Sequence, residues 1–233
     1  MFKEIRILES DKTVAVEAAK MFEEYANYFV ENLGQFNVAL AGGGTPKQMH
    51  QHLSKYNVDW TKIHILFSDE RSVPPTAPNS NFFLAYNSLL KNIDIPNQNI
   101  HPMQTLGISA QESAFLYEKT VARLNKNLEL DAIFLGIGPD GHTASIFPNS
   151  QLINSDYYIE AIHDSPKLPK TRISFTLKLL NNARNIVFLA TGASKAKAVE
   201  NILEKDLALP ANLVRPPDGN LFWLLDKQAA KYL

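Results

Sequence analysis

The feature that most constrains this chain is the alternation of short apolar runs with segments of helical periodicity. Apolar runs bounded by glycine or charge predict buried strands, and apolar residues that recur with the period of a helix turn predict amphipathic helices. Strands that alternate with helices are typical of an α/β fold with a mostly parallel, Rossmann-like sheet and helices on both faces. Strands are expected at 36–41, 63–69, 131–138, 185–191 and 220–226, with weaker patterns at 157–162 and 172–177. Helices are expected at 14–33, 46–54, 79–91, 109–126 and 192–205, and a short one at the C-terminal end.

Residues at the ends of two predicted helices support these boundaries. Ser10 or Asp11 can cap the first helix, because their side-chain oxygens accept backbone hydrogen bonds. Gly34 can end it, because glycine readily adopts the left-handed conformation found after helices. Ser109 and Glu112 have the spacing of a capping box at the start of the fourth helix.

Length and composition indicate one folded unit. The 233 residues are 45% hydrophobic, which is enough to bury a substantial core. No internal repeat or low-complexity tract divides the chain, and the proline-rich stretches 72–81 and 163–170 are short enough to be ordered loops. We therefore expect residues 1–233 to form a single α/β domain.

Charge, cysteine content and hydropathy exclude several classes of protein. The 23 basic and 24 acidic residues are near balance and form no basic run, so no nucleic-acid partner is expected. Without cysteine there is no disulfide, thiolate ligand or thiol nucleophile, which fits a reducing compartment. The N-terminal segment lacks the apolar region of a secretory signal, and no stretch approaches the ~20 apolar residues of a membrane span. We expect a cytoplasmic protein without membrane contact.

Unusual residues collect where four of the predicted strands end. In open α/β sheets, ligands bind outside the carboxyl ends of the strands. The sequences that follow these strands are "GGGTP", "ERSVPP", "PDGHTAS" and "GASK". Together they predict one binding site at this edge of the sheet.

The first of these segments is suited to an anion. Gly42, Gly43 and Gly44 lead from a strand into a helix, where backbone N–H groups and the helix dipole favour negative charge. Thr45 adds a hydroxyl donor. The segment lacks the G-x-x-x-x-G-K-[ST] pattern, so it is not the P-loop of a protein that binds nucleoside triphosphates. The alternative interpretation is a tight turn that simply requires glycine.

Charged residues supply further candidates for the site. Asp69, Glu70 and Arg71 are consecutive, so their side chains diverge and one can face the cleft while another pairs structurally. Arg71 could clamp a phosphate through two hydrogen bonds, and Arg172 precedes a strand from which it could reach the cleft. Lys195 is poorly placed for the helix dipole unless it meets an anion. The alternative for each is a solvated surface charge.

The segment "GIGPDGHTASIFP" (136–148) contains a G-x-G-x-x-G pattern followed by histidine. A dinucleotide-binding turn needs a long helix after the third glycine, and Pro148 follows Gly141 too closely to allow one. His142 is a better candidate for a general base, because imidazole accepts a proton near neutral pH. Asp140 could fix its tautomer and orientation. The alternative is a histidine that only bonds the loop.

The remaining histidines do not indicate a metal site. His50 and His52 are two positions apart, so they face different sides of a helix, and no H-E-x-x-H or comparable spacing occurs. We expect a mechanism without a metal and without a cofactor.

The motifs at the strand ends, taken together, resemble the 6-phosphogluconolactonase family, which is related to glucosamine-6-phosphate deaminase/isomerase. The matching segments are "ALAGGGTP" (39–46), "SDERSVP" (68–74), "NSNF" (79–82), "GIGPDGHTASIFP" (136–148), "RIS" (172–174) and "TGASKA" (191–196). The resemblance implies a NagB/RpiA-like fold and hydrolysis of 6-phospho-D-glucono-1,5-lactone to 6-phosphogluconate, the second step of the oxidative pentose phosphate pathway. The implied partner is a small phosphosugar lactone. The protein is expected to be a monomer or a homodimer.

Two motifs distinguish the lactonase from the deaminase/isomerase. The deaminase branch has "MDEY" where this chain has "SDER", and a glutamate in "GHIAFNEP" where this chain has Phe147. Ring opening and isomerisation need that additional acid/base group, whereas lactone hydrolysis does not. The departure favours the lactonase.

The hypothesis for the site assigns a role to each candidate residue. Arg71, Lys195 and the Gly42–Thr45 loop hold the substrate phosphate with help from Arg172, while His142 activates water and Asp140 orients His142. Two alternatives stay open: an aldose–ketose isomerase of the deaminase type, and a sugar-phosphate sensor without catalysis.

Overall fold

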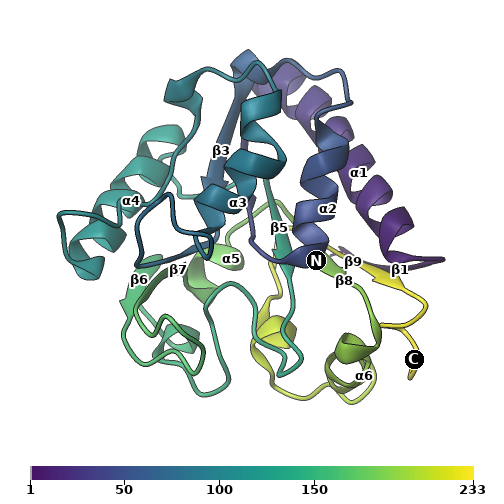
Figure 1. Cartoon of the computed structure of the whole chain (residues 1–233). Coiled ribbons are helices and arrows are strands. Elements are labelled where there is room, and N and C mark those ends of the chain that lie inside the picture. The colour runs from purple at the N-terminus through teal and green to yellow at the C-terminus, as the bar shows by residue number, and fades with distance from the viewer. Residues whose placement is uncertain (1) are drawn as a thin grey trace.

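A six-stranded parallel sheet forms the centre of the protein, which we describe from a computed structural model over residues 2–233 (Figure 1). Its strand order is β1-β9-β8-β5-β2-β3. The strands are β1 (Phe2–Leu8), β2 (Phe36–Leu40), β3 (Ile63–Phe67), β5 (Ala132–Gly136), β8 (Asn185–Ala190) and β9 (Asn220–Asp226). Within the described range, no helix is both long and apolar enough to cross a membrane.

Helices cover both faces of this sheet, and a second, smaller sheet lies beside it (Figure 1). The helices are α1 (Asp11–Leu33), α2 (Gly44–Leu53), α3 (Asn81–Ser88), α4 (Ala110–Leu124), α5 (Leu177–Leu180) and α6 (Ala196–Leu203). Short 3-10 helices lie at Trp60–Lys62, Leu90–Asn92, Asn97–Asn99, Gln151–Ile153, Ala193–Lys195 and Pro210–Leu213. The small sheet is antiparallel in the order β4-β7-β6, with β4 (Asp69–Arg71), β6 (Ile159–Ile162) and β7 (Arg172–Phe175).

Two hydrophobic cores explain why the central strands are continuously apolar. Alternate side chains of a strand point to opposite faces of a sheet. In β8, Ile186 and Phe188 join the core that contains α4, α6 and the small sheet, and Val187 and Leu189 join the core that contains α1, α2 and α3. A strand buried on both faces loses the alternation of apolar and polar residues, as expected for a parallel sheet. The predicted α/β class and mostly parallel sheet are thereby confirmed.

The strand predicted at 63–69 is in fact divided between the two sheets. Ser68 donates its backbone N–H to Leu40 O in the large sheet (3.0 Å), and its carbonyl accepts from Phe175 N in the small sheet (2.8 Å). The chain therefore changes sheets at Ser68, and β4 was not expected as a separate strand. This switch carries Asp69 and Arg71 away from the large sheet.

The two ends of the described chain also differ from expectation. β1 was not predicted, because charged residues interrupt its apolar positions and the strand lies at the edge of the sheet. Residues 227–232 form turns and not the predicted short helix. There the carboxylate of Asp226 accepts from Ala229 N (2.7 Å) and its carbonyl from Ala230 N (3.0 Å), which caps a single turn that does not continue as a helix. At α1, in contrast, Ser10 is the N-cap and Gly34, with a φ of 80°, is the C-cap, as predicted.

Candidate active site

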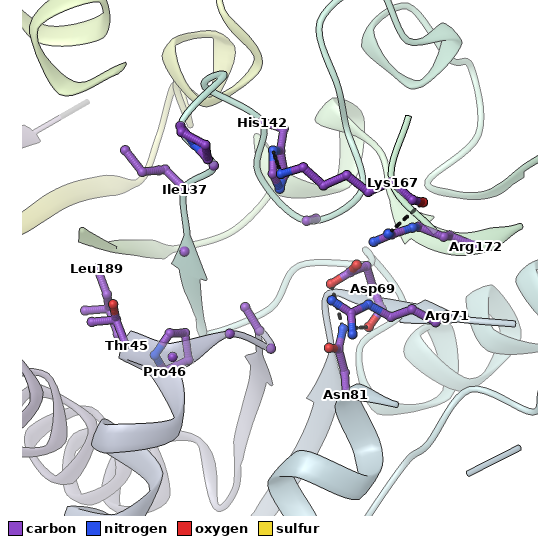
Figure 2. A pocket seen from close by; sticks show the side chains of 18 of the residues that line it. Thr45, Pro46, Asp69, Arg71, Asn81, Ile137, His142, Lys167, Arg172 and Leu189 are labelled. Atoms are coloured by element: carbon purple, nitrogen blue, oxygen red, sulfur yellow. Dashed lines mark hydrogen bonds between the residues drawn. The ribbon is translucent and has the colours of Figure 1, made fainter. Parts of the chain in front are cut away.

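A cavity of about 330 Å³ lies where the carboxyl ends of β2, β5 and β8 meet the small sheet (Figure 2). β2 and β5 are neighbours in the sheet. The strand that follows each of them in the large sheet lies on the outer side of this pair, β3 beside β2 and β8 beside β5. Such a point, where strand order reverses, leaves a crevice between the loops that follow the two strands. The cavity therefore lies at the edge of the sheet that the sequence predicted.

The loop after β5 holds His142 in a tight turn. Gly138 N donates to His142 O (2.8 Å), and Gly141 N donates to Gly138 O (3.0 Å). Gly141 has a φ of 80°, a conformation that favours glycine. A Cβ on Gly138 would overlap the side chains of His142 and Asp140, so only glycine fits there. Gly138 and Gly141 thus both serve this turn.

Asp140 supports His142 from outside the cavity. Oδ1 of Asp140 hydrogen-bonds Nδ1 of His142. An ionised carboxylate only accepts hydrogen bonds, so the proton of a neutral His142 resides on Nδ1 and Nε2 keeps its lone pair. Within residues 2–233, no protein group hydrogen-bonds Nε2. His142 lines the cavity and Asp140 does not.

The pKa values of this pair follow from burial and charge. Burial lowers the pKa of His142 below its ordinary value, and the hydrogen bond and charge of Asp140 oppose this only in part. Burial raises the pKa of Asp140, but the hydrogen bond and charge of His142, with the charge of Lys167, outweigh it and leave that pKa lowered. His142 is therefore neutral and Asp140 ionised at neutral pH.

Phe147 packs its ring against His142. The ring centroids are 4.5 Å apart and the planes are tilted by 32°, and Phe147 is buried. Arg172 approaches the same ring, with Cζ 5.7 Å from its centroid. The position at which the deaminase branch has a glutamate therefore holds an apolar wall beside the histidine.

The glycine loop after β2 is shaped by its neighbours. A Cβ on Gly42 would overlap the amide of Asn81, and Gly43 has a φ of 110°. α2 begins at Gly44, so the N-terminus of this helix opens into the cavity. Thr45 Oγ1 lies 2.7 Å from Thr191 Oγ1 at the end of β8.

Lys195 lines the same cavity from the turn before α6. Burial lowers the pKa of Lys195, and the charge of Lys167 lowers it further, while Asp140 raises it. Among the described residues, the Lys195 ammonium has no hydrogen bond or ion pair, so it is available to an anion.

The three charges at 69–71 diverge as the sequence predicted. Asp69 and Arg71 line the cavity, and Glu70 points into the protein. The carboxylate of Asp69 accepts from Ser145 Oγ (2.6 Å) and Asn81 Nδ2 (3.0 Å), which fixes its position (Figure 2).

Glu70 has a structural role at the start of α3. Its carboxylate accepts from Ser80 Oγ (2.9 Å), Asn81 N (2.8 Å) and Phe82 N (2.8 Å). Arg71 donates from Nη1 to Asn79 O (2.6 Å), and its buried Nε has no partner. Arg71 thus retains donor capacity for a ligand.

Arg172 is buried and binds the loop that follows β6. Its guanidinium donates to the carbonyl oxygens of Lys167 (3.1 Å), Leu168 (3.4 Å) and Pro169 (3.2 Å), and to Ser145 Oγ (3.5 Å). Arg172 lines the cavity as expected, but most of its donors are directed to the 167–169 backbone.

Most of the candidates therefore converge on one cavity. Those that line it are Gly42, Gly43, Gly44, Thr45, Asp69, Arg71, His142, Arg172 and Lys195. The sequence reasoning missed Lys167, whose Nζ lies 3.5 Å from His142 Nδ1 (Figure 2). The basic, proline-rich loop just before Arg172 was the indication of Lys167 in the sequence. The sequence reasoning also did not single out Asn81 within "NSNF".

The described residues contain no group of three or more His, Asp or Glu side chains that could hold a metal ion.

The sheet order and the cavity at the strand ends are those of an open α/β protein with a crevice at its topological switch point, and cationic side chains line that crevice. A family model described as glucosamine-6-phosphate isomerases/6-phosphogluconolactonase matches residues 9–223. The chain belongs to this family, and the resemblance drawn from its motifs is confirmed.

Relatives on the lactonase side of the family are similar along nearly the whole chain. A 6-phosphogluconolactonase of Synechocystis sp. is 38% identical over 208 residues, which are 86% of this chain and 85% of the relative. The structure of a 6-phosphogluconolactonase from Thermotoga maritima has a TM-score of 0.89 at 29% identity, covering 97% of this chain and all of the other. A monomeric glucosamine-6-phosphate deaminase has a TM-score of 0.86 at 21% identity, covering 99% of this chain and 100% of the other, which shows a shared fold alone.

Proposed function

We propose that this protein hydrolyses 6-phospho-D-glucono-1,5-lactone to 6-phosphogluconate, with His142 as the general base. The observation that carries the proposal is a neutral imidazole, oriented by Asp140, at a cavity surrounded by cations. The similarity to named 6-phosphogluconolactonases supports the substrate. Phe147 in place of a carboxylate favours hydrolysis over isomerisation.

The proposed reaction needs one base that later acts as an acid. Nε2 of His142 takes a proton from water as the water oxygen bonds to C1 of the lactone. The tetrahedral intermediate then collapses, the C1–O5 bond breaks, and the proton on Nε2 passes to O5. Asp140 stabilises the imidazolium that exists between the two steps. The products are a carboxylic acid, which ionises, and the open-chain hydroxyl.

Phosphate binding is assigned to groups from both sheets. Arg71 and Lys195 supply cationic donors, and Gly42–Thr45 supplies backbone N–H groups at the start of α2. Asp69, held by two hydrogen bonds, is suited to accept one from a sugar hydroxyl. This arrangement keeps the lactone carbonyl near His142.

Two residues receive roles that the sequence did not suggest. Lys167 lies close enough to His142 to stabilise the oxyanion that forms at C1. Arg172 fixes the backbone that carries Lys167, so we assign it to positioning this loop in addition to its expected help with phosphate.

The remaining expectations stay part of the proposal. We propose a single catalytic domain over 1–233 in the cytoplasm, acting on a small phosphosugar without nucleic acid, membrane or metal. Turnover is accordingly expected to persist in the presence of a chelator.

His142→Ala tests the central claim. A positioned general base contributes ~10²–10⁴-fold, so kcat should fall by that factor while KM changes little. The assay generates the lactone in situ and subtracts spontaneous ring opening. His52→Ala, near the end of α2, is the matched control and should retain wild-type turnover. Wild-type kcat in His142→Ala would remove His142 from the mechanism.

Arg71→Ala tests the phosphate clamp. Loss of a cationic donor should raise KM for the phosphorylated lactone and leave turnover of an unphosphorylated lactone unchanged. An equal loss on both substrates would contradict the assignment. Assays of the wild-type protein distinguish the two alternatives. Formation of a ketose from glucosamine 6-phosphate would indicate the isomerase, and tight binding of 6-phosphogluconate without lactone hydrolysis would indicate the sensor.

A further inference from the structure

The outer side of β1 is an open edge of the large sheet. β1 pairs with β9 on one side, and no strand within residues 2–233 pairs with its other side; Figure 1 shows β1 at the margin of the sheet. At the opposite margin, β3 is partly covered, because Ile65 bridges Ile100 and accepts from His101 N (2.9 Å). An uncovered edge can pair with a strand of another chain.

The outward backbone groups of β1 belong to three residues. The amide of Phe2 and the carbonyl of Leu8 bond toward β9, at 3.3 and 3.0 Å. Because successive residues of a strand direct their N–H and C=O groups to opposite sides, Lys3, Ile5 and Ile7 direct theirs outward. The edge therefore offers three donors and three acceptors.

Three apolar side chains on β1 are exposed. Phe2, Ile5 and Ile7 are 53%, 41% and 52% exposed. Charge normally protects an edge strand, and β1 carries Lys3, Glu4 and Arg6, of which Arg6 already hydrogen-bonds Glu4 and Glu17 of its own chain. Lys3 lines a small cavity together with Asp206, which is ion-paired with Arg215 (2.5 Å).

We propose that β1 pairs antiparallel with β1 of a second copy, around a two-fold axis at Ile5, and joins the two large sheets. Ile5 then faces Ile5 of the second copy, and Lys3 faces Ile7, so that all the outward backbone groups of both strands are satisfied. Glu4 lies opposite Arg6 on the face nearer α1. Opposite charges across a strand pair are favourable.

The charges of β1 select this register over its neighbours. A shift of one residue would place outward backbone groups opposite inward ones. A shift of two would place Glu4 opposite Glu4, or Arg6 opposite Arg6, and like charges directly opposite are destabilising. The strand is therefore complementary to itself in one antiparallel register, which identifies a second copy of this chain as the partner.

Cysteine cross-linking tests the register, because the chain has no native cysteine. Ile5→Cys should form a covalent dimer rapidly under oxidation or with a short thiol cross-linker. Ile7→Cys is the matched control: in this register the two copies of residue 7 are ~14 Å apart, and cross-linking should be at least tenfold slower. Equal rates for both variants, or no dimer with Ile5→Cys, would overturn the proposal.

Sedimentation equilibrium of the full chain gives a second readout. The wild type should dimerise with rising concentration, and Ile5→Lys, which places two lysines face to face, should weaken dimerisation at least tenfold. Phe115→Lys makes the same kind of change at an exposed aromatic residue of α4, far from β1, and should dimerise like the wild type. Wild-type protein that is monomeric at millimolar concentration, or a dimer unaffected by Ile5→Lys, would contradict this interface.

Discussion

His142 is placed between two groups that shift its pKa in opposite directions. Burial lowers the pKa of His142 below its ordinary value, Asp140 opposes this by hydrogen bonding and charge, and the charge of Lys167 lowers the pKa further. A general base must be neutral, so activity falls as pH drops through this pKa. The acid limb of the wild-type profile is therefore expected below pH ~6.5.

Substitution of either neighbour should move that limb in opposite directions. In Asp140→Asn the carboxylate charge is lost, the pKa of His142 falls further, and the acid limb of kcat/KM moves to lower pH. In Lys167→Met the opposing cation is lost and the limb moves to higher pH. The measurement is kcat/KM against pH for the three proteins. Limbs that move in the same direction would contradict the assigned electrostatics.

Some residues of the site were predictable one by one, and others were not. His142, Arg71 and Lys195 stand directly after strand patterns, so the geometry of a parallel sheet brings them to one edge. Lys167 lies in an irregular loop whose path depends on hydrogen bonds to Arg172. No periodicity in the sequence encodes that path, so Lys167 could be located only in the folded protein.

At the scale of elements, the turn between β5 and His142 depends on Gly138 as well as on Gly141. A Cβ at Gly138 would overlap Nδ1 of His142 and Oδ1 of Asp140. Gly138→Ala should separate this pair and lower kcat toward that of a protein without its base, by ~10²-fold or more. Gly138 is buried in this turn, so the melting temperature should also fall, and kcat is measured at a temperature where the variant is folded. An unaltered kcat would show that the turn can adapt without loss of the pair.

A buried carboxyl at the start of β5 makes stability depend on pH. Asp131 accepts from Asn37 N (2.8 Å), and burial raises its pKa to about 6. Because the folded state favours the protonated form, stability should decline as pH rises from ~4 through ~6, by at most ~3 kcal/mol. Asp131→Asn removes this titration, so its unfolding free energy relative to the wild type should rise over the same range. Denaturant unfolding at several pH values measures the unfolding free energy of both proteins. If the two free energies change with pH in the same way, the assignment to Asp131 is contradicted.

At this scale, sequence reasoning failed where the chain changes from the hydrogen bonds of one sheet to those of the other. The central strands and the ends of α1 were predicted, because burial and capping leave local patterns. The change of sheet at Ser68 was not, because the apolar run continues into it and the deciding bond comes from Phe175, far along the chain. Long-range bonds of this kind leave no local pattern.

At the scale of the molecule, the two sheets meet around the cavity and supply its charge jointly. The chain carries a net charge of −1, yet Arg71, Lys167, Arg172 and Lys195 all line this cavity. Lys195 lies after β8 of the large sheet, whereas Arg71 in β4 and Arg172 in β7 are part of the small sheet. A bound phosphosugar would therefore connect both sheets and resist their separation.

This connection predicts that the product stabilises the whole fold. A ligand that binds only the folded state adds ~2.7 kcal/mol at a hundred times its Kd, so above its Kd 6-phosphogluconate should raise the melting temperature with the logarithm of its concentration. Gluconate, which lacks the phosphate, should have a much smaller effect. Arg71→Ala should lose most of the shift, whereas His52→Ala should keep it. Equal shifts with gluconate and 6-phosphogluconate would mean that the cations around the cavity do not recognise phosphate.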